Sequence, residues 1–223
     1  MRRPFLLTIL LVAAQAAAMT PGADPGVNTP FHQPDPERWN RILEQPGREL
    51  FDRRQAIVAA LGLKPGMMVA DVGAGTGLFT VPFAQAVGPE GRVYAVDVAA
   101  EFVDNIERRV RDQGLGNVVG IVNNQHSTLL PPESLDLVFL ADTYHHFEQP
   151  ADMLRSIHGA LRPGGELVVI DFQREPGTSS PWVMHHVRAG RGQVIAEVEL
   201  AGFRFTREEP ILRGNFFLRF RKP

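Results

Sequence analysis

Five short apolar runs, separated by stretches with helical periodicity, constrain the fold of this chain more than any other feature. The runs are MMVADV at 67–72, RVYAVDV at 92–98, VVGIV at 118–122, LDLVFL at 135–140 and ELVVIDF at 166–172. Between them, apolar residues have helical spacing at 78–87, 101–113 and 151–161. Strands that alternate with helices predict a parallel sheet with helices on both faces.

Segments on either side of this region complete the predicted fold. A helix is expected at 48–61. After another helix near 192–201, the segments 204–208 and 215–221 are expected to form an antiparallel hairpin at the sheet edge. With 223 residues, 44% of them hydrophobic, the chain is long enough for one full core. We therefore predict one α/β domain over 37–223: a single doubly wound, mostly parallel seven-stranded sheet with an antiparallel C-terminal edge hairpin.

The first 36 residues have the composition of targeting and linker segments. Two arginines, an apolar run and small residues follow one another within 1–18, which predicts a secretory signal peptide. Residues 19–36 are rich in proline and are predicted to be an extended linker, so that structure begins near Glu37. The alternatives to a signal peptide are an uncleaved anchor and a start codon misassigned upstream of the true protein.

This N-terminal pattern also predicts a location. The apolar run at 5–19 is shorter than the roughly 20 residues of a spanning helix, so no stable membrane insertion is expected after cleavage. We expect a periplasmic or secreted protein, with the cytoplasm as the alternative.

The composition excludes several kinds of partner and site. Acidic residues outnumber basic ones by 25 to 23, and two of the basic residues lie in the predicted signal peptide. Binding to nucleic acid normally requires a basic surface, so no nucleic-acid partner is expected. The chain has no cysteine, which rules out disulfides, zinc-thiolate sites and thiol nucleophiles.

A glycine-rich loop, VADVGAGTG, follows the first predicted strand and precedes a helix. Asp71, Gly73, Gly75 and Gly77 lie in it. Glycines at such a junction let backbone amides approach a nucleotide-like ligand. Dinucleotide enzymes use the spacing G-x-G-x-x-G, whereas the third glycine here comes one position early. Asp97 ends the second strand 20 residues after Gly77, a position from which a carboxylate can bind both ribose hydroxyls.

These motifs resemble, in order, those of the class I S-adenosylmethionine-dependent methyltransferases. The resemblance rests on VADVGAGTG, VDV, LPPESLDLVFL and LRPGGELVVIDF and covers roughly residues 48–221. It implies S-adenosylmethionine as cofactor and methyl transfer as the reaction, and it leaves the acceptor open. The residues that it implies for the cofactor site are Asp71, Gly73, Ala74, Gly75, Gly77, Asp97, Val98, Asn124, Gln125, Ala141, Phe51 and Arg54.

The resemblance also assigns roles to these residues. The loop at 71–77 would hold the methionine end of the cofactor, and Asp97 the ribose. Asn124 would contact the adenine where the family often has an acidic residue, with Gln125 or His126 as alternatives. The helix that carries Phe51 and Arg54 would close over the cofactor.

Polar residues after the fourth and fifth predicted strands are candidates for the acceptor site, because open parallel sheets bind ligands at the carboxyl ends of their strands. The segments ADTYHHFE and WVMHHVRAG supply two histidine pairs. We hypothesise that His146 or His186 is a general base, with Asp142 or Tyr144 orienting it or the substrate. In the alternative, one histidine of each pair packs in the core and its neighbour is solvated.

A metal site is a weaker alternative, and none is predicted. Some family members that methylate catechols hold magnesium with acidic residues at positions comparable to Asp142 and Asp171. The asparagine expected after the second acid is Phe172 here, which counts against magnesium. Histidines together with Asp142 would suit a transition metal instead.

The sequence thus favours a methyltransferase that acts on a small-molecule acceptor bound at the histidine-rich turns. Two other classes stay open: a non-catalytic module that binds S-adenosylmethionine, and an NAD-dependent oxidoreductase. Nothing in the pattern indicates an oligomeric state.

Overall fold

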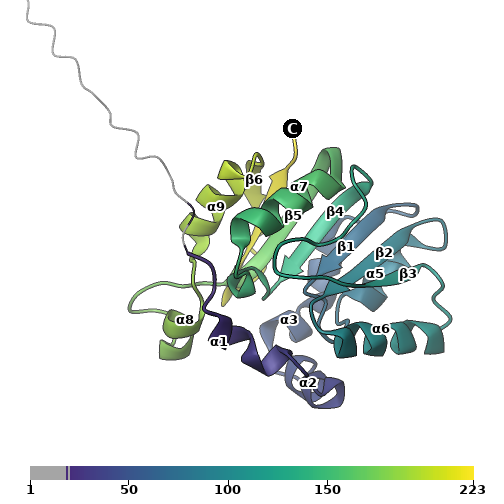
Figure 1. Cartoon of the computed structure of the whole chain (residues 1–223), viewed down its shortest axis with the longest axis horizontal. Coiled ribbons are helices and arrows are strands. Elements are labelled where there is room, and N and C mark those ends of the chain that lie inside the picture. The colour runs from purple at the N-terminus through teal and green to yellow at the C-terminus, as the bar shows by residue number, and fades with distance from the viewer. Residues whose placement is uncertain (1–18, 20) are drawn as a thin grey trace, which may run out of the picture.

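The computed structural model describes residue 19 and residues 21–223 (Figure 1). The signal peptide predicted at 1–18 lies outside the described residues and stays a prediction. Within the described part of the chain, no helix is long and apolar enough to cross a membrane.

A seven-stranded sheet in the order β3-β2-β1-β4-β5-β7-β6 forms the centre of the molecule. The strands are β1 (Met68–Val72), β2 (Arg92–Asp97), β3 (Val118–Val122), β4 (Leu135–Ala141), β5 (Leu161–Phe172), β6 (Arg204–Glu208) and β7 (Asn215–Arg221). The first five pair in parallel, and β7 pairs antiparallel with both β5 and β6. The predicted α/β fold class is confirmed.

Helices lie on both faces of this sheet (Figure 1). They are α1 (Pro25–Asn28), α2 (Pro36–Leu43), α3 (Glu49–Asp52), α4 (Arg54–Leu61), α5 (Thr80–Val87), α6 (Ala100–Asp112), α7 (Pro150–Ala160), α8 (Pro181–His186) and α9 (Arg191–Leu200), with 3-10 turns η1 (Thr29–Phe31) and η2 (Tyr144–His146). The single helix predicted at 48–61 is divided into α3 and α4. The break is at Arg53, whose backbone leaves the helical region at φ −97° and ψ 3°.

Successive strand residues point to opposite faces and pack against different helices. In β1, Val69 belongs to a core cluster with Ile57 of α4 and Phe83 of α5. The next residue, Ala70, packs in the other cluster, with Leu154 of α7 and residues of α9. Because both faces are covered, the central strands are continuously apolar rather than alternating.

The C-terminal hairpin has β6, not β7, at the sheet edge. β7 is inserted between β5 and β6, so every residue from Asn215 to Phe220 is buried. The alternation in NFFLRFR comes from one buried cation, Arg219, whose guanidinium pairs with Glu166 and donates to the carbonyl of Ala60.

The prediction that residues 19–36 form an extended linker is wrong, because part of this segment is helical. Pro25 and Pro36 occupy first-turn positions of α1 and α2, where the missing N–H of proline costs nothing. Asp24 and Asp35 precede them and accept backbone N–H bonds as N-caps. The prolines that suggested a linker therefore start helices.

The same segment is attached to the rest of the domain. The Ala23 amide donates to the Phe147 carbonyl at 2.8 Å. The backbone at Gly22 passes so close to Glu148 that a Cβ there would lie 1.7 Å from the Glu148 carbonyl oxygen. Residues 22–31 thus run next to the turn after β4, at the carboxyl edge of the sheet.

Candidate active site

A cavity of about 470 Å³ opens at the carboxyl ends of β1, β2 and β4. β1 and β4 are neighbours, and the chain continues from β1 toward β2 and from β4 toward β5 on the opposite side, which makes this the switch point of the sheet. Of the residues predicted for the cofactor, those that line the cavity are Asp71, Gly73, Ala74, Gly75, Asp97, Val98, Asn124, Gln125 and Ala141.

The loop after β1 presents bare backbone to this cavity. The amides of Gly73 and Ala74 both donate to the Val96 carbonyl, at 2.8 and 3.0 Å, which ties the loop to β2. Gly73 has φ +70°, and a Cβ there would lie 2.2 Å from the Cγ2 of Thr143. Only glycine permits this close approach with this backbone conformation.

Two buried carboxyl groups lie beneath the loop. Asp97 accepts from the Gly75 amide at 2.8 Å and from the Ala99 amide at 3.0 Å. Asp71 accepts from the Thr80 hydroxyl at 2.7 Å. Burial raises the pKa of Asp71 to about 7, against the lowering effect of the Thr80 hydrogen bond. Burial also raises the pKa of Asp97, although backbone hydrogen bonds oppose it.

These residues fit a ligand with hydroxyl groups and positive charge. The Thr76 hydroxyl is buried at the cavity wall and has no hydrogen-bond partner within the described part of the chain. Asp71 and Asp97 supply carboxylates that a cationic group or a ribose would stabilise. S-adenosylmethionine carries an ammonium group, a sulfonium and a ribose, so the glycine loop and these side chains suit it.

Three residues predicted for the cofactor lie outside the cavity wall. Gly77 has φ +83°, and a Cβ there would lie 2.9 Å from Ile106, so this glycine allows the loop to pack on α6. Phe51 contacts the guanidinium of Arg54, which lies 4.3 Å from its ring centre. From the same region, Arg48 and Leu50 line the cavity instead. The helical spacing of residues 48–61 did not indicate which of their side chains face the cavity.

Helix α2, which the sequence did not predict, covers the cofactor end of the cavity. Trp39 and Leu43 of this helix line the cavity wall. Glu44, just after the helix, pairs with Arg109 at 2.5 Å, and the same guanidinium donates to the Thr76 carbonyl at 2.6 Å. Arg109 of α6 thus ties the cover to the glycine loop. Helix α2 begins with the N-cap Asp35 and with Pro36, and this pair is the sequence signal that would have revealed the helix.

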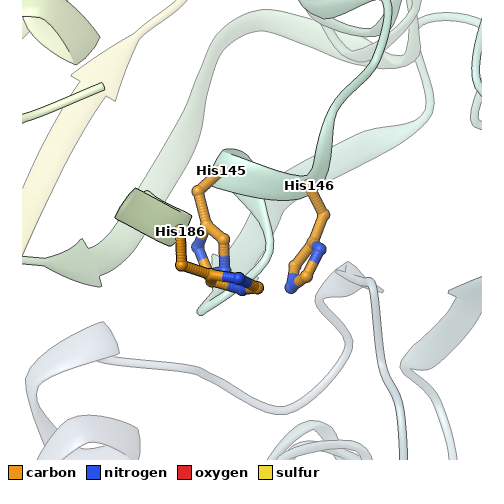
Figure 2. Close-up of side chains that lie close together, drawn as sticks. All are labelled: His145, His146 and His186. Carbon is orange, nitrogen blue, oxygen red and sulfur yellow. The ribbon is translucent and has the colours of Figure 1, made fainter. Parts of the chain in front are cut away.

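Three histidines converge at the opposite end of the cavity (Figure 2). His145 and His146 come from η2 and His186 from α8, and their rings point toward one another. One ring nitrogen from each lies within 4.8 Å of those of the other two. The sheet makes this possible by placing the turn after β4 next to the segment after β5. Three of the four paired histidines thus lie together, and His185 is not part of the cluster.

Polar partners orient two of these rings. The Nδ1 of His145 lies 2.7 Å from the Asp171 carboxylate, which is buried with it. The Nδ1 of His146 lies 2.8 Å from the Asn28 amide oxygen. Asn28 holds the proton of neutral His146 on Nδ1, which leaves the Nε2 lone pair of this ring available to the cavity.

The environment shifts the pKa of each histidine. Burial, together with the neighbouring His145 and His186, lowers the pKa of His146 to about 2. Burial also lowers the pKa of His186, with His145 contributing. Burial acts to lower the pKa of His145 as well, but Asp171 and Asp142 outweigh it and raise that pKa. His146 and His186 are therefore neutral near pH 7.

Neither Asp142 nor Tyr144 is hydrogen-bonded to the ring of His146 or His186; that Asp142, which lines the cavity, orients the substrate instead stays a prediction. Tyr144 is fully buried away from the cavity, and its hydroxyl donates to Glu197 at 2.5 Å. Asp142 lines the cavity, but its carboxylate accepts from Arg48 at 2.7 Å and from Asn215 at 2.6 Å. Burial raises the pKa of Asp142 to about 6, and Arg48 opposes the rise.

Aromatic rings surround the histidines. Trp182 stacks on His186 with ring centres 4.4 Å apart, and Phe172 meets Trp182 edge-on. From the N-terminal segment, Phe31 packs against the His146 ring and stacks on Trp39. The contacts of His146 with Asn28 and Phe31 join residues more than 100 positions apart, so no local sequence pattern could have indicated them. This half of the cavity is an aromatic chamber with three imidazoles.

Comparison with known proteins identifies the family of this architecture. Residues 70–169 match the family model described as a methyltransferase domain. A solved structure of an S-adenosylmethionine-dependent methyltransferase from Aquifex aeolicus is 30% identical, with a TM-score of 0.74, and the match covers 86% of this chain and 100% of that one.

Curated relatives have named activities. The chain is 28% identical over 154 residues to a demethylmenaquinone methyltransferase of Geobacillus kaustophilus, covering 63% of this chain and 65% of the relative. It is 32% identical over 129 residues to a ubiquinone/menaquinone biosynthesis C-methyltransferase of a Shewanella species, covering 57% of this chain and 51% of the relative. The chain thus matches about half to two thirds of the length of these relatives. With its glycine loop, strand order and cavity, it belongs to the class I S-adenosylmethionine-dependent methyltransferases.

Proposed function

We propose that this protein is an enzyme that transfers a methyl group from S-adenosylmethionine to a small hydroxylated aromatic acceptor of the quinol type. One observation carries the proposal: a single cavity joins the glycine loop to a chamber of histidine, tryptophan and phenylalanine rings. Flat aromatic ligands pack well against such rings. The named activities of the relatives, which concern quinone methylation, agree with this class of acceptor.

The proposed chemistry is an in-line displacement that needs positioning and exclusion of water. The cofactor supplies a methyl group on a positively charged sulfur, and the acceptor loses a proton as it gains the methyl group. Residues 73–76 and Asp97 would hold the cofactor, and α2 would cover it. Trp182, Phe172 and Phe31 would hold the acceptor ring at the other end of the cavity.

The hypothesis that His146 or His186 is the general base stays a prediction. In its favour, both rings line the cavity, and both have lowered pKa values. A neutral imidazole can accept the acceptor's hydroxyl proton at pH 7. Replacing each histidine singly by alanine should lower the turnover of an identified acceptor by about 10²- to 10⁴-fold. Full turnover in both variants would remove the base hypothesis.

The test of the function is transfer of a labelled methyl group. The full chain is incubated with methyl-deuterated S-adenosylmethionine and a panel of reduced quinols, catechols and simple phenols, and products are analysed by mass spectrometry. We expect a label on at least one quinol. Asp97→Ala should abolish the product, and Gly116→Ala, where nothing lies within 4 Å of the added Cβ, should leave it unchanged.

Two outcomes would contradict the proposal. Binding of the cofactor without transfer to any panel member would favour the non-catalytic module. Transfer to phenols or other acceptors, with none to a quinol, would retain the enzyme and overturn its acceptor class.

A further inference from the structure

We propose that His145, His146 and His186 form a binding site for a divalent transition metal ion, and we take Zn²⁺ as its occupant. The three rings converge from two elements, with one nitrogen of each within 4.8 Å of the other two (Figure 2). Among residues 19 and 21–223, this is the one group of three or more potential ligands found so close together. The proposal concerns metal binding alone and does not require the methyl transfer.

The size of the cluster suits a single ion. Three imidazole nitrogens on a tetrahedral Zn²⁺, at about 2.0–2.1 Å from the metal, lie about 3.4 Å apart. The histidine nitrogens therefore have to draw together by up to about 1.4 Å. His186 is half-buried at the end of the six-residue helix α8, where a rotation of the side chain would supply this movement.

The groups behind the ligands are those of a histidine metal site. Metal-binding imidazoles usually donate their other N–H to a carboxylate or carbonyl oxygen, which fixes the ring and makes it a better ligand. Asp171 accepts such a bond from the Nδ1 of His145 at 2.7 Å, and the Asn28 amide oxygen accepts one from the Nδ1 of His146 at 2.8 Å. His186 is held by its stack on Trp182. Each ring thus has a neighbour that orients it, and for His145 and His146 this neighbour contacts Nδ1 and leaves Nε2 for an ion.

Charge and ligand type narrow the choice of ion. Imidazole nitrogens suit Zn²⁺, Cu²⁺, Ni²⁺ and Fe²⁺, whereas Mg²⁺ and Ca²⁺ prefer oxygen. The buried carboxylate of Asp171 and the nearby Asp142 offset part of the positive charge of an ion. The Asp142 carboxylate is hydrogen-bonded to Arg48 and Asn215, so we do not count it among the metal ligands.

The cavity leaves a coordination position for a small ligand. All three histidines line it, and three protein ligands with one open position are the arrangement of catalytic rather than structural zinc. The fourth ligand would be water or an oxygen of the bound acceptor. If the proposed function holds, an acceptor hydroxyl at this position would have a lowered pKa and a fixed orientation, and the metal would take the place of His146 or His186 as the group that promotes loss of its proton.

The test is direct metal binding by the full chain without a histidine tag. The protein is stripped with chelator, dialysed and titrated with ZnCl₂ by calorimetry, and Co²⁺ serves as a spectroscopic substitute. We expect one Zn²⁺ per chain and the visible absorption of four-coordinate Co²⁺. His186→Ala should weaken Zn²⁺ binding by at least tenfold, and Asp171→Asn by about 10- to 100-fold.

A matched control is available in the adjacent residue. His185 is exposed and bonds the Pro181 carbonyl, so His185→Ala should bind Zn²⁺ as the unmodified chain does. Circular dichroism of each variant establishes that it is folded. Because His186 lies at the cavity wall on a short helix, its replacement should leave the fold intact even if a change at buried His145 does not.

The outcomes separate this inference from the proposed function. Absence of a one-to-one Zn²⁺ site, or equal affinity in the unmodified chain and in folded His186→Ala, overturns the metal site whatever the methyl-transfer result. Zn²⁺ binding with these variant effects, but no methylated acceptor, supports the metal site and contradicts the proposed function.

Discussion

Asp71 lies where ionisation costs free energy, which makes the stability of the cofactor-free protein depend on pH. Burial raises its pKa from 3.8 to about 7. The folded protein therefore holds this proton up to about pH 7, whereas the unfolded chain releases it near pH 4. The sign follows: this group lowers stability progressively as pH rises from about 4 to 7.

Asp71→Asn should remove this loss because asparagine does not titrate. Relative to the unmodified chain, the variant should gain stability with rising pH, by up to about 4 kcal/mol between pH 4 and 8. Urea unfolding of both proteins without cofactor, at pH 4 to 8, measures the difference. A difference that does not change with pH would contradict the assigned pKa shift.

Gly73 is the residue of the loop with the least room for a side chain. Gly73→Ala places a Cβ against Thr143 at a positive φ, so we expect a loss of about 1–3 kcal/mol in stability and weaker cofactor binding. Gly116→Ala, where nothing lies within 4 Å of the added Cβ, is the control. Thermal unfolding and calorimetric titration with S-adenosylmethionine measure both effects, and equal behaviour of the two variants would show that the loop has room to adjust.

At the scale of elements, the cover formed by α1, η1 and α2 depends on few contacts. Asn28 is its main anchor, since its amide donates to the His146 carbonyl and to Glu148 and accepts from the His146 ring. Asn28→Ala leaves these buried groups without partners, which costs about 1–3 kcal/mol.

The expected result of Asn28→Ala is local opening of the cover. Limited proteolysis should cut within residues 21–35 faster than in the unmodified chain, while the sheet stays protected. Exposed His32, in the same segment, supplies the control His32→Ala. Unchanged cleavage in Asn28→Ala would mean that the cover is held by its other contacts.

At the scale of the whole molecule, cofactor binding should stabilise the folded state. A ligand that binds only the native protein adds about 2.7 kcal/mol at 100 times its Kd. For a chain of 223 residues this corresponds to a rise of about 5–11 °C in Tm. Differential scanning fluorimetry with S-adenosylmethionine and with NAD measures it. A shift with NAD alone would contradict the assignment of the cofactor site.

Much of the fold was predictable because local patterns carry it. The central strands are apolar throughout because helices cover both faces of the sheet. The loop after β1 needs positive φ angles at its glycines, which other residues rarely adopt. The prediction failed at residues 19–36, where prolines were assigned to a linker although their aspartate caps place them at helix starts. The proline content of that segment suggested a linker, whereas the order of an aspartate cap followed by a proline produces a helix start.

In the candidate site, too, the features with a local sequence pattern were predictable and the long-range contacts were not. The sheet, the cofactor loop and the position of Asp97 could be predicted from the residues alone, because they depend on neighbours within a strand or a turn. Long-range contacts instead place Asn28 and Asp171 against His146 and His145. They also turn Tyr144 into the core and bring His186 into the histidine cluster. The hydrogen bond between His145 and Asp171 joins residues 26 positions apart, and the one between His146 and Asn28 joins residues 118 positions apart. They form because folding brings separate segments to one edge of the sheet, a proximity that no local pattern encodes.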